Sequence, residues 1–313
     1  MRVAVVDLGT NTTRLLVAEV EDGSLRELDK QTTITRLGQG VDATGQLADE
    51  AMDRVRDTLT RYREIMDRES VTETIAVATS AMRDASNGPA FRDELNERFG
   101  IDARTISGDE EARLTFLGAT SGRTPAAERP SETVVIDIGG GSTEYVIGPP
   151  NSAPDFHVST QMGSVRHSER FLKSDPPEHD ELVALAEDVW RVIEQHVPAK
   201  YREETVEGIA VAGTATTLAA IDQELDPYDP EKMHGYRVNL ASAERIQAML
   251  AALPLEQRRN VTGLHPDRAP TIVAGVTILV ESIRAFGLDE IEVSEADILH
   301  GAAMAAGDGS AGA

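Results

Sequence analysis

One short phrase occurs twice in the chain. The first copy, VVDLGTNTTRL, spans residues 5–15, and the second, VIDIGGGSTEY, spans residues 135–145. In each copy an apolar run leads into Asp, one aliphatic residue, Gly and a string of small residues, several of which carry hydroxyls. Glycine permits a tight turn, and consecutive backbone N–H groups in such a turn form a concave anion site. A structural turn explains either copy alone, but the pair indicates two phosphate loops.

Each copy also places a carboxylate at the end of its strand-like run, Asp7 in the first and Asp137 in the second. A carboxylate is a poor neighbour for phosphate but a good ligand for hydrated Mg²⁺. We therefore predict Mg²⁺ as the cofactor, held by Asp7, Asp137 and Glu144. The residues predicted to bind phosphate are Gly9, Thr10, Asn11, Thr12 and Arg14 in the first loop, and Gly139, Gly140, Gly141, Ser142 and Thr143 in the second.

The segments around these loops alternate between strand and helix patterns. Strand-like runs at 2–7 and 14–21 flank the first loop, and similar runs flank the second. This alternation predicts an α/β fold, and the repeated loop predicts two related domains that face each other with phosphate between them. Further strands are expected within 75–82 and at 291–294, helices at 47–67, 87–100, 178–197, 241–252, 272–287 and 296–306, and a strand, turn and helix within 208–221.

The composition narrows the class of protein. Of 313 residues, 40% are hydrophobic, and cysteine is absent, which excludes disulfides and thiol nucleophiles. No apolar run is long enough to span a membrane, and the N-terminus has no signal-peptide pattern. The net charge is −24, with 54 acidic and 30 basic residues, only four of them Lys. This balance is typical of a halophile and argues against nucleic-acid binding, so we expect a cytoplasmic protein that binds neither membrane nor nucleic acid.

An ordered set of motifs resembles a known family. DLGTNTTRL, ATSAMRDASNG, SGDEEARLTFLGA, VIDIGGGSTEYVIG, MGSVRHSERF and AGTATTLAAI occur in the same order as in the exopolyphosphatase and guanosine pentaphosphate phosphohydrolase family. The resemblance runs from Val3 to about Ala303. It implies two ribonuclease-H-like domains of the actin, sugar-kinase and heat-shock ATPase superfamily, with a phosphate-binding cleft between them.

The resemblance also implies a division of the chain. The first domain is expected to comprise residues 1–119 with a C-terminal helix in 295–313, and the second to comprise residues 120–294. We expect the short form of the family, without a C-terminal HD domain. The pair His179–Asp180 is accordingly interpreted as part of the surface.

The candidate catalytic residues lie in two of these motifs. Ser107 and Glu110 fit a helix capping box, which gives Glu110 a structural role but leaves Glu111 unexplained. In the family, the Glu of the E-A-R-L string is the proposed base for the attacking water, and here that residue is Glu111. The family also places an arginine beside the phosphate chain, which here is Arg83, whose planar guanidinium suits a phosphate. An ion pair of Arg83 with Asp84 or Glu111 is the alternative.

Two further segments are expected near the substrate. In the family, the GSVRHSERF segment contacts the substrate, which makes Arg166 a candidate phosphate ligand. His167 and Arg170 complete a small basic cluster, whose alternative role is to pair with Glu169 or Asp175. Gly213 and Thr214 lie in the segment that lines the cleft on the second domain, although a structural turn explains them as well.

Several functions fit these residues. The leading interpretation is an exopolyphosphatase that releases terminal orthophosphate from linear inorganic polyphosphate in a Mg²⁺-dependent hydrolysis. Hydrolysis of guanosine pentaphosphate at its terminal phosphate is the close alternative, because both substrates present a phosphoanhydride end. A superfamily kinase or a non-catalytic actin-like protein is disfavoured, since aromatic residues make up only 4% of the chain and an adenosine site is weakly marked. We expect a homodimer.

Overall fold

The chain folds into two compact units. A computed structural model describes residues 1–21, 24–121, 132–150 and 152–307. Met1–Gly118 and Ile298–Ala313 form the first unit, and Ala119–Asp297 forms the second. The last segment of the chain therefore returns to the unit in which the chain begins.

The first unit contains a five-stranded sheet in the order β3-β2-β1-β4-β5. β1, β2 and β3 are antiparallel neighbours, whereas β4 is parallel to β1 and β5 is parallel to β4. The central strand β1 is almost wholly buried, as its apolar sequence predicts. The strands are β1 (Arg2–Leu8), β2 (Thr12–Glu21), β3 (Ser24–Ile34), β4 (Glu73–Ala78) and β5 (Ala103–Thr105).

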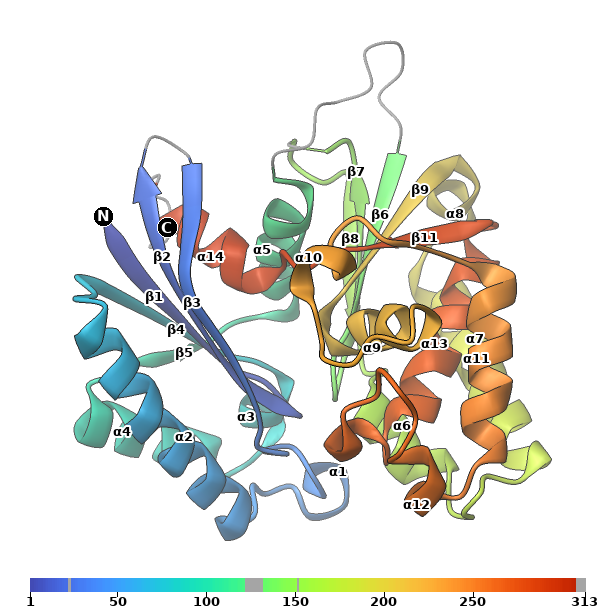
Figure 1. The fold of residues 1–313 in the computed structure, drawn as a ribbon, viewed down its shortest axis with the longest axis horizontal. Helices are drawn as coiled ribbons and strands as arrows, with labels where there is room; N and C mark the ends of the chain where they lie inside the picture. Colours follow the sequence, from blue (N-terminus) through green and yellow to red (C-terminus); the bar gives the residue numbers. More distant parts are fainter. Residues whose placement is uncertain (22–23, 122–131, 151, 308–313) are drawn as a thin grey trace. The chain divides into compact units, whose positions relative to one another are not determined.

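Helices cover both faces of this sheet (Figure 1). Alternate residues of β1 point to opposite faces, so Val6 packs in a cluster with α2 and α4, whereas Val5 packs with α14. α14 lies close against α5, because a Cβ added at Gly301 would be 1.8 Å from the carbonyl oxygen of Leu114. The helices are α1 (Val41–Thr44), α2 (Asp49–Arg68), α3 (Ser80–Asp84), α4 (Gly88–Phe99), α5 (Gly108–Thr120) and α14 (Ile298–Gly307).

The second unit repeats this topology. Its sheet has the order β10-β11-β9-β6-β7-β8, so β8-β7-β6-β9-β11 corresponds to β3-β2-β1-β4-β5 with β10 added at the edge. Again the first three strands are antiparallel, and the fourth is parallel to the first. The strands are β6 (Glu132–Ile138), β7 (Thr143–Gly148), β8 (Phe156–Thr160), β9 (Thr205–Val211), β10 (Arg237–Asn239) and β11 (Glu290–Val293).

A buried helix organises the core of the second unit. α13 is buried at nearly every position and packs against α6, α7, α9 and α11 (Figure 1). Its sequence, IVAGVTILVESIRA, is apolar on all sides up to Val280 and carries charged residues only near its end, at Glu281 and Arg284, which is expected of a helix surrounded by others. The helices are α6 (Ser164–Phe171), α7 (His179–His196), α8 (Ala199–Glu204), α9 (Ala212–Asp222), α10 (Pro230–Met233), α11 (Leu240–Ala252), α12 (Leu255–Arg258) and α13 (Ile272–Ala285), with a 3₁₀ turn, η1, at Pro266–Arg268.

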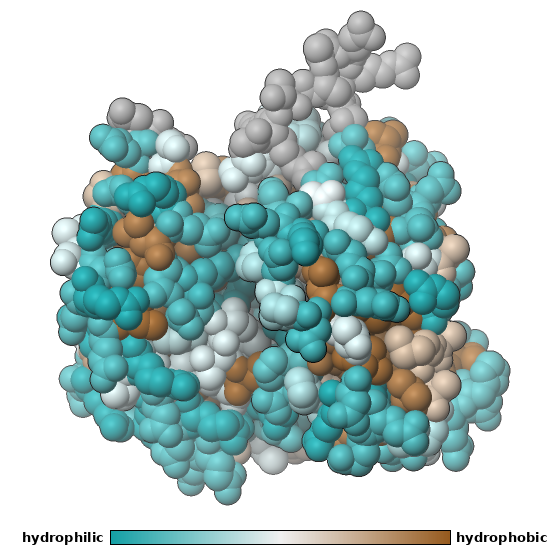
Figure 2. Space-filling view, viewed as in Figure 1, coloured by the Kyte–Doolittle hydropathy of each residue, from teal (hydrophilic) through white to brown (hydrophobic). Residues whose placement is uncertain are grey.

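The face of the molecule in Figure 2 is mostly polar. On the face shown in Figure 2, hydrophilic residues predominate and apolar residues appear as small patches. Among the described residues, no helix has the length and hydropathy needed to cross a bilayer. The apolar residues of both units are instead gathered in their cores.

Candidate active site

The repeated phrase folds into the same turn in both units. The N–H of Gly9 donates to the carbonyl of Thr12 at 2.9 Å, and the N–H of Gly139 donates to the carbonyl of Ser142 at 3.0 Å. A Cβ at Gly9 would lie 2.9 Å from the Thr12 oxygen, and one at Gly139 would lie 3.2 Å from the Ser142 oxygen. Glycine is needed at the first position of the first turn because the chain closes so tightly there, and the second turn closes almost as tightly.

In the first turn, the segment after β3 binds the carbonyl groups. The N–H of Gly38 donates to the carbonyl of Thr10 at 2.8 Å, and the N–H groups of Thr35 and Arg36 both donate to the carbonyl of Asn11. The hydroxyl of Thr10 lies 2.8 Å from that of Ser80, at the start of α3. The turn is therefore fixed from two sides within the first unit.

In the second turn, α6 binds the carbonyl groups. The N–H of Ser164 donates to Gly139, and those of Val165 and Arg166 donate to Gly140. Among the described residues, no protein acceptor lies within hydrogen-bond distance of the backbone N–H groups of Gly140, Gly141 and Ser142. Three consecutive N–H groups of this kind form a nest for an anion. The hydroxyl of Thr143, by contrast, donates to the carbonyl of Met162 at 2.6 Å, so this side chain serves the fold.

The carboxylates next to the turns have different partners in the two units. Asp7 faces Arg14 across β1 and β2, and Nε and Nη2 of Arg14 lie 2.9 and 2.7 Å from Oδ2 of Asp7. Asp137 occupies the same place in the second unit but faces Glu144. The first unit thus places an ion pair where the second places two carboxylates.

The second pair has the donor chemistry that Mg²⁺ needs. Asp137 and Glu144 are both buried, and the Ser159 hydroxyl donates to Oε1 of Glu144 at 2.7 Å. Mg²⁺ is commonly bound by one or two carboxylates together with water and substrate phosphates, so this pair fits the ion. Within the described ranges, no group of three or more His, Cys, Asp and Glu residues is arranged to hold a metal.

The structure brings Glu111 and Arg83 together. Ser107 Oγ accepts from the N–H of Glu110 at 3.1 Å, as expected of a helix cap, while the Glu110 carboxylate lies 2.5 Å from Arg104. Glu111 is only 8% exposed, and its Oε2 lies 3.7 Å from Nη1 of Arg83. The ion pair that the sequence left as an alternative for Arg83 is therefore present, and a role of either residue in catalysis has to be compatible with it.

The basic cluster on α6 separates into three environments. Nε of Arg166 donates to the carbonyl of Gly141 at 2.8 Å, so this side chain reaches the glycine turn. His167 is buried, and burial lowers its pKa to about 4. Its Nδ1 accepts from the N–H of Gly163, and its Nε2 lies 3.3 Å from Asp188. Arg170 lies 3.6 Å from Asp188 and over the ring of Phe171.

The small-residue segment with Gly213 and Thr214 forms the first turn of α9 and is covered by an arginine that the sequence analysis missed. A Cβ added at Gly213 would lie 1.5 Å from Nη1 of Arg268, so the guanidinium rests directly on this glycine. Thr214 is buried against α13, where a Cβ at Gly275 would lie 2.8 Å from its hydroxyl oxygen. Arg268 is far from Gly213 in the sequence, and no motif links the two.

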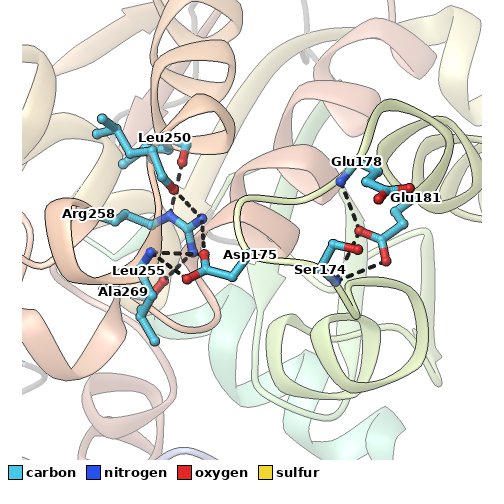
Figure 3. A network of polar contacts seen from close by, with 9 residues as sticks. Ser174, Asp175, Glu178, Glu181, Leu250, Leu255, Arg258 and Ala269 are labelled. Atoms are coloured by element: carbon cyan, nitrogen blue, oxygen red, sulfur yellow. Dashed lines mark hydrogen bonds and ion pairs between the residues drawn. The ribbon is translucent and has the colours of Figure 1, made fainter.

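A second missed arginine fixes the segment that follows Arg268. Arg258 is only 4% exposed, and burial lowers its pKa. Its guanidinium donates to the carbonyls of Leu250, Leu253 and Ala269 at 2.9, 2.8 and 3.2 Å, and Asp175 lies 3.7 Å away (Figure 3). Arg258 therefore connects α11, the segment before α13 and the link between α6 and α7.

The same link is held at its other end by Glu181. Its carboxylate accepts from the N–H groups of Glu178 and Ser174 at 2.9 and 3.1 Å, which completes a capping box at the start of α7 (Figure 3). These backbone hydrogen bonds lower the pKa of Glu181. The chain that follows α6 is thus fixed by two charged side chains, Arg258 and Glu181, that the sequence analysis did not single out.

Comparison with known proteins places this architecture in one class. Crystal structures of the Aquifex aeolicus Ppx/GppA family member and of an exopolyphosphatase from Cytophaga hutchinsonii are both 29% identical to the chain. The Aquifex aeolicus structure aligns with 98% of this chain and 97% of its own chain, with a TM-score of 0.80. The Cytophaga hutchinsonii structure aligns with 99% of this chain and 98% of its own chain, with a TM-score of 0.90. The predicted fold class, an α/β protein with two domains of the actin-like type, is confirmed.

The family assignment follows from the sequence comparison. The Ppx/GppA phosphatase family model matches residues 16–305. Exopolyphosphatase 2 of Mycobacterium tuberculosis is 38% identical over 316 aligned residues, covering 97% of this chain and 98% of that protein. The chain belongs to the Ppx/GppA phosphatase family, which confirms the predicted resemblance.

Proposed function

We propose that the protein is an exopolyphosphatase, which hydrolyses linear inorganic polyphosphate from its end and releases orthophosphate. The observation that carries this proposal is the turn shared by the two units, which in the second unit presents three N–H groups without a protein acceptor. A flexible polyanion of repeating phosphates suits backbone nests, which recognise charge and geometry and no other group. The name of the Mycobacterium tuberculosis relative supports the same substrate.

The residues of each unit have distinct roles in this proposal. The N–H groups of Gly140, Gly141 and Ser142 hold phosphate oxygens, and the first turn, at residues 9–12, contributes in the same way. Asp137 and Glu144 would hold Mg²⁺ in the second unit, and Asp7 is the proposed metal ligand of the first unit. When bound, the ion would neutralise charge on the phosphate oxygens.

Glu111 provides the base of the proposed reaction. Its carboxylate accepts a proton from the attacking water as the terminal phosphoanhydride bond breaks, and general base catalysis of this kind contributes about 10²–10⁴-fold to a rate. Arg83, whose Nη1 lies 3.7 Å from Glu111, would bind the terminal phosphate and keep the carboxylate in place. This ion pair agrees with the proposed roles because it brings the base next to a phosphate ligand.

Guanosine pentaphosphate is the second candidate substrate. Its phosphoanhydride end would meet the same turns, and the family takes its name from both activities. The acidic composition favours polyphosphate in our proposal, together with the named relatives. The test is phosphate release from polyphosphate, guanosine pentaphosphate and ATP, measured side by side with Mg²⁺ in molar KCl. Release from polyphosphate at the highest kcat/KM supports the proposal, and release from ATP alone overturns it.

The proposal includes the location and the oligomeric state of the enzyme. We infer a cytoplasmic, halophilic protein from the net charge of −24 and the scarcity of Lys. We also infer a homodimer, which light scattering in molar KCl tests directly. A monomer mass of 33.7 kDa under conditions that support activity would remove the dimer from the account.

A further inference from the structure

Helix α6 binds three consecutive carbonyl groups of the second glycine turn. The N–H of Ser164 donates to Gly139 at 2.9 Å, the N–H groups of Val165 and Arg166 donate to Gly140 at 2.9 and 3.1 Å, and Nε of Arg166 donates to Gly141 at 2.8 Å. The first two carbonyls are bound by the backbone of α6. The third depends on one side chain.

Peptide planarity converts these contacts into a direction for the N–H groups. In a trans peptide, the carbonyl of one residue and the N–H of the next point to opposite sides. Because the three carbonyls of residues 139–141 point toward α6, the N–H groups of Gly140, Gly141 and Ser142 point away from it. The direction of the nest is therefore fixed by α6, and the direction of the Ser142 N–H depends on Arg166.

Glycine at the start of α6 permits this close approach. A Cβ added at Gly163 would lie 2.3 Å from the carbonyl oxygen of Gly140 and 2.6 Å from the nitrogen of Gly141. The φ angle of Gly163 is −154°, which any residue adopts, so glycine is needed here for space and not for conformation. Contacts beyond the turn hold α6 in place, since buried His167 links Gly163 to Asp188 of α7.

We propose that Arg166 is a positioning residue that orients the phosphate-binding turn through the carbonyl of Gly141. This inference rests on the proposed function, which assigns phosphate to the nest. Glycine tolerates more than one backbone conformation, so the peptide between Gly141 and Ser142 is free to rotate when its carbonyl loses the guanidinium. A rotated peptide would present a carbonyl oxygen to the anion in place of an N–H donor. Arg166 thus acts before any substrate arrives, unlike the direct phosphate ligand that the sequence analysis predicted.

The experiment is NMR of the ligand-free protein with ¹⁵N-labelled backbone amides. In Arg166→Gln, we expect the amide signals of Gly140, Gly141 and Ser142 to shift or broaden, with the other amides of the unit unchanged. Arg191→Gln is the matched control, because it also replaces an arginine of the second unit by glutamine, but Arg191 pairs with Asp188 of α7 and not with the turn. Unchanged turn amides in ligand-free Arg166→Gln would overturn the proposal and leave a direct phosphate contact as the explanation for any loss of binding.

Binding of inorganic tripolyphosphate, measured calorimetrically in EDTA to prevent turnover, provides the second readout. Arg166→Gln should weaken binding by about tenfold or more, the range for a hydrogen bond that involves a charged group. Arg166→Lys should restore part of the affinity together with the wild-type amide positions. Recovery of affinity without recovery of the amide positions would contradict the positioning role.

A second variant addresses the same turn if Arg166→Gln fails to fold. Gly163→Ala would push the turn from its other side and should shift the same amides. Gly148→Ala is its control, since a Cβ there would also be crowded, 2.9 Å from Cα of Pro154, at the far end of β7. Equal effects of the two alanines on the turn amides would overturn the proposal. The NMR result does not depend on activity. If the amide signals shift in a protein that cleaves no polyphosphate, the positioning role of Arg166 is supported and the proposed function is rejected.

Discussion

Replacing Glu111 with Gln separates its proposed role as a base from its role in the structure. Glutamine has nearly the same shape and keeps a carbonyl oxygen for Arg83, but it cannot accept a proton from water. Loss of a general base costs about 10²–10⁴-fold in rate, which corresponds to about 3–5 kcal/mol in the activation barrier. We therefore expect kcat to fall by at least about 100-fold.

The effect on stability should be much smaller. Glu111 is buried, but Arg83, whose side chain is 26% exposed, also donates to the carbonyl of Ile106 at 3.1 Å and lies 3.8 Å from Asp84. Because Arg83 keeps these partners and glutamine keeps the shape of the side chain, the loss in unfolding free energy should be on the order of 1 kcal/mol. A large loss of activity with a small change in unfolding free energy would therefore indicate chemistry and not folding.

The assay is steady-state release of phosphate from polyphosphate, with tripolyphosphate binding in EDTA measured in parallel. Glu110→Gln is the matched control, because Glu110 is the preceding residue and pairs with Arg104 outside the proposed machinery. The control should retain activity within about twofold, as surface ion pairs contribute little. Near wild-type turnover in Glu111→Gln, or an equal loss in both variants, would refute the assignment of Glu111 as the base.

Three further predictions concern the metal, pH and salt. Asp137→Asn, Glu144→Gln and Asp7→Asn should each raise the Mg²⁺ concentration needed for half-maximal activity. If a variant has an unchanged Mg²⁺ activation curve, the residue replaced in it has a structural role in its turn or, for Asp7, in its ion pair with Arg14. Burial lowers the pKa of His167 to about 4, below the ordinary value of about 6.5. Between these two pH values the unfolded chain binds a proton that the folded protein does not, so the free energy of unfolding decreases as pH falls from about 6.5 to 4. His167→Gln should flatten the dependence of unfolding free energy on pH in this range by up to about 3 kcal/mol. An unchanged pH dependence would show that folding does not shift the pKa of His167. Activity, and the folded fraction measured by far-UV circular dichroism, should both increase from about 0.1 M KCl toward about 3 M, before activity declines. The reason is that the Debye length falls to about 3 Å or less at such concentrations, which screens the repulsion between acidic residues. A protein that is fully folded and most active at the lowest salt concentration would contradict the halophilic interpretation.

The sequence predicted the turns and the elements beside them because both depend on local chemistry. Asp7 and Asp137 end buried strands, and the glycines after them close tight turns in the structure. The strand and helix expected within 208–221 correspond to β9 and α9, but no turn separates them, because β9 ends at Val211 and α9 begins at Ala212. Repetition of the phrase also predicted two related domains, which the matching strand orders confirm.

Other elements lacked a local signal. β3, with the sequence SLRELDKQTTI, is a polar and mostly accessible edge strand, so its residues do not alternate in the way that identifies a half-buried strand. Its position follows from pairing with β2. The short helices α10 and α12 have four residues each, which is too few for a periodic pattern.

The site residues that escaped prediction act over long sequence distances. Arg268 covers Gly213, and Arg258 binds carbonyls on either side of α12, but neither contact follows from a spacing. The roles of charged residues on α6 were also hard to assign, because an arginine that binds a carbonyl looks the same in the sequence as one that binds a phosphate. His167 was grouped with basic residues, yet its burial makes it a neutral link between Gly163 and Asp188.

The central claim is hydrolysis of polyphosphate from its end, and ³¹P NMR of a long polyphosphate during turnover tests it most directly. The account predicts that the orthophosphate signal grows from the first time point at the expense of internal phosphate, in a reaction that requires Mg²⁺ and is lost in Glu111→Gln. New terminal signals from fragments of intermediate length would show internal cleavage. That result, or the absence of orthophosphate under conditions in which guanosine pentaphosphate is hydrolysed, would contradict the account.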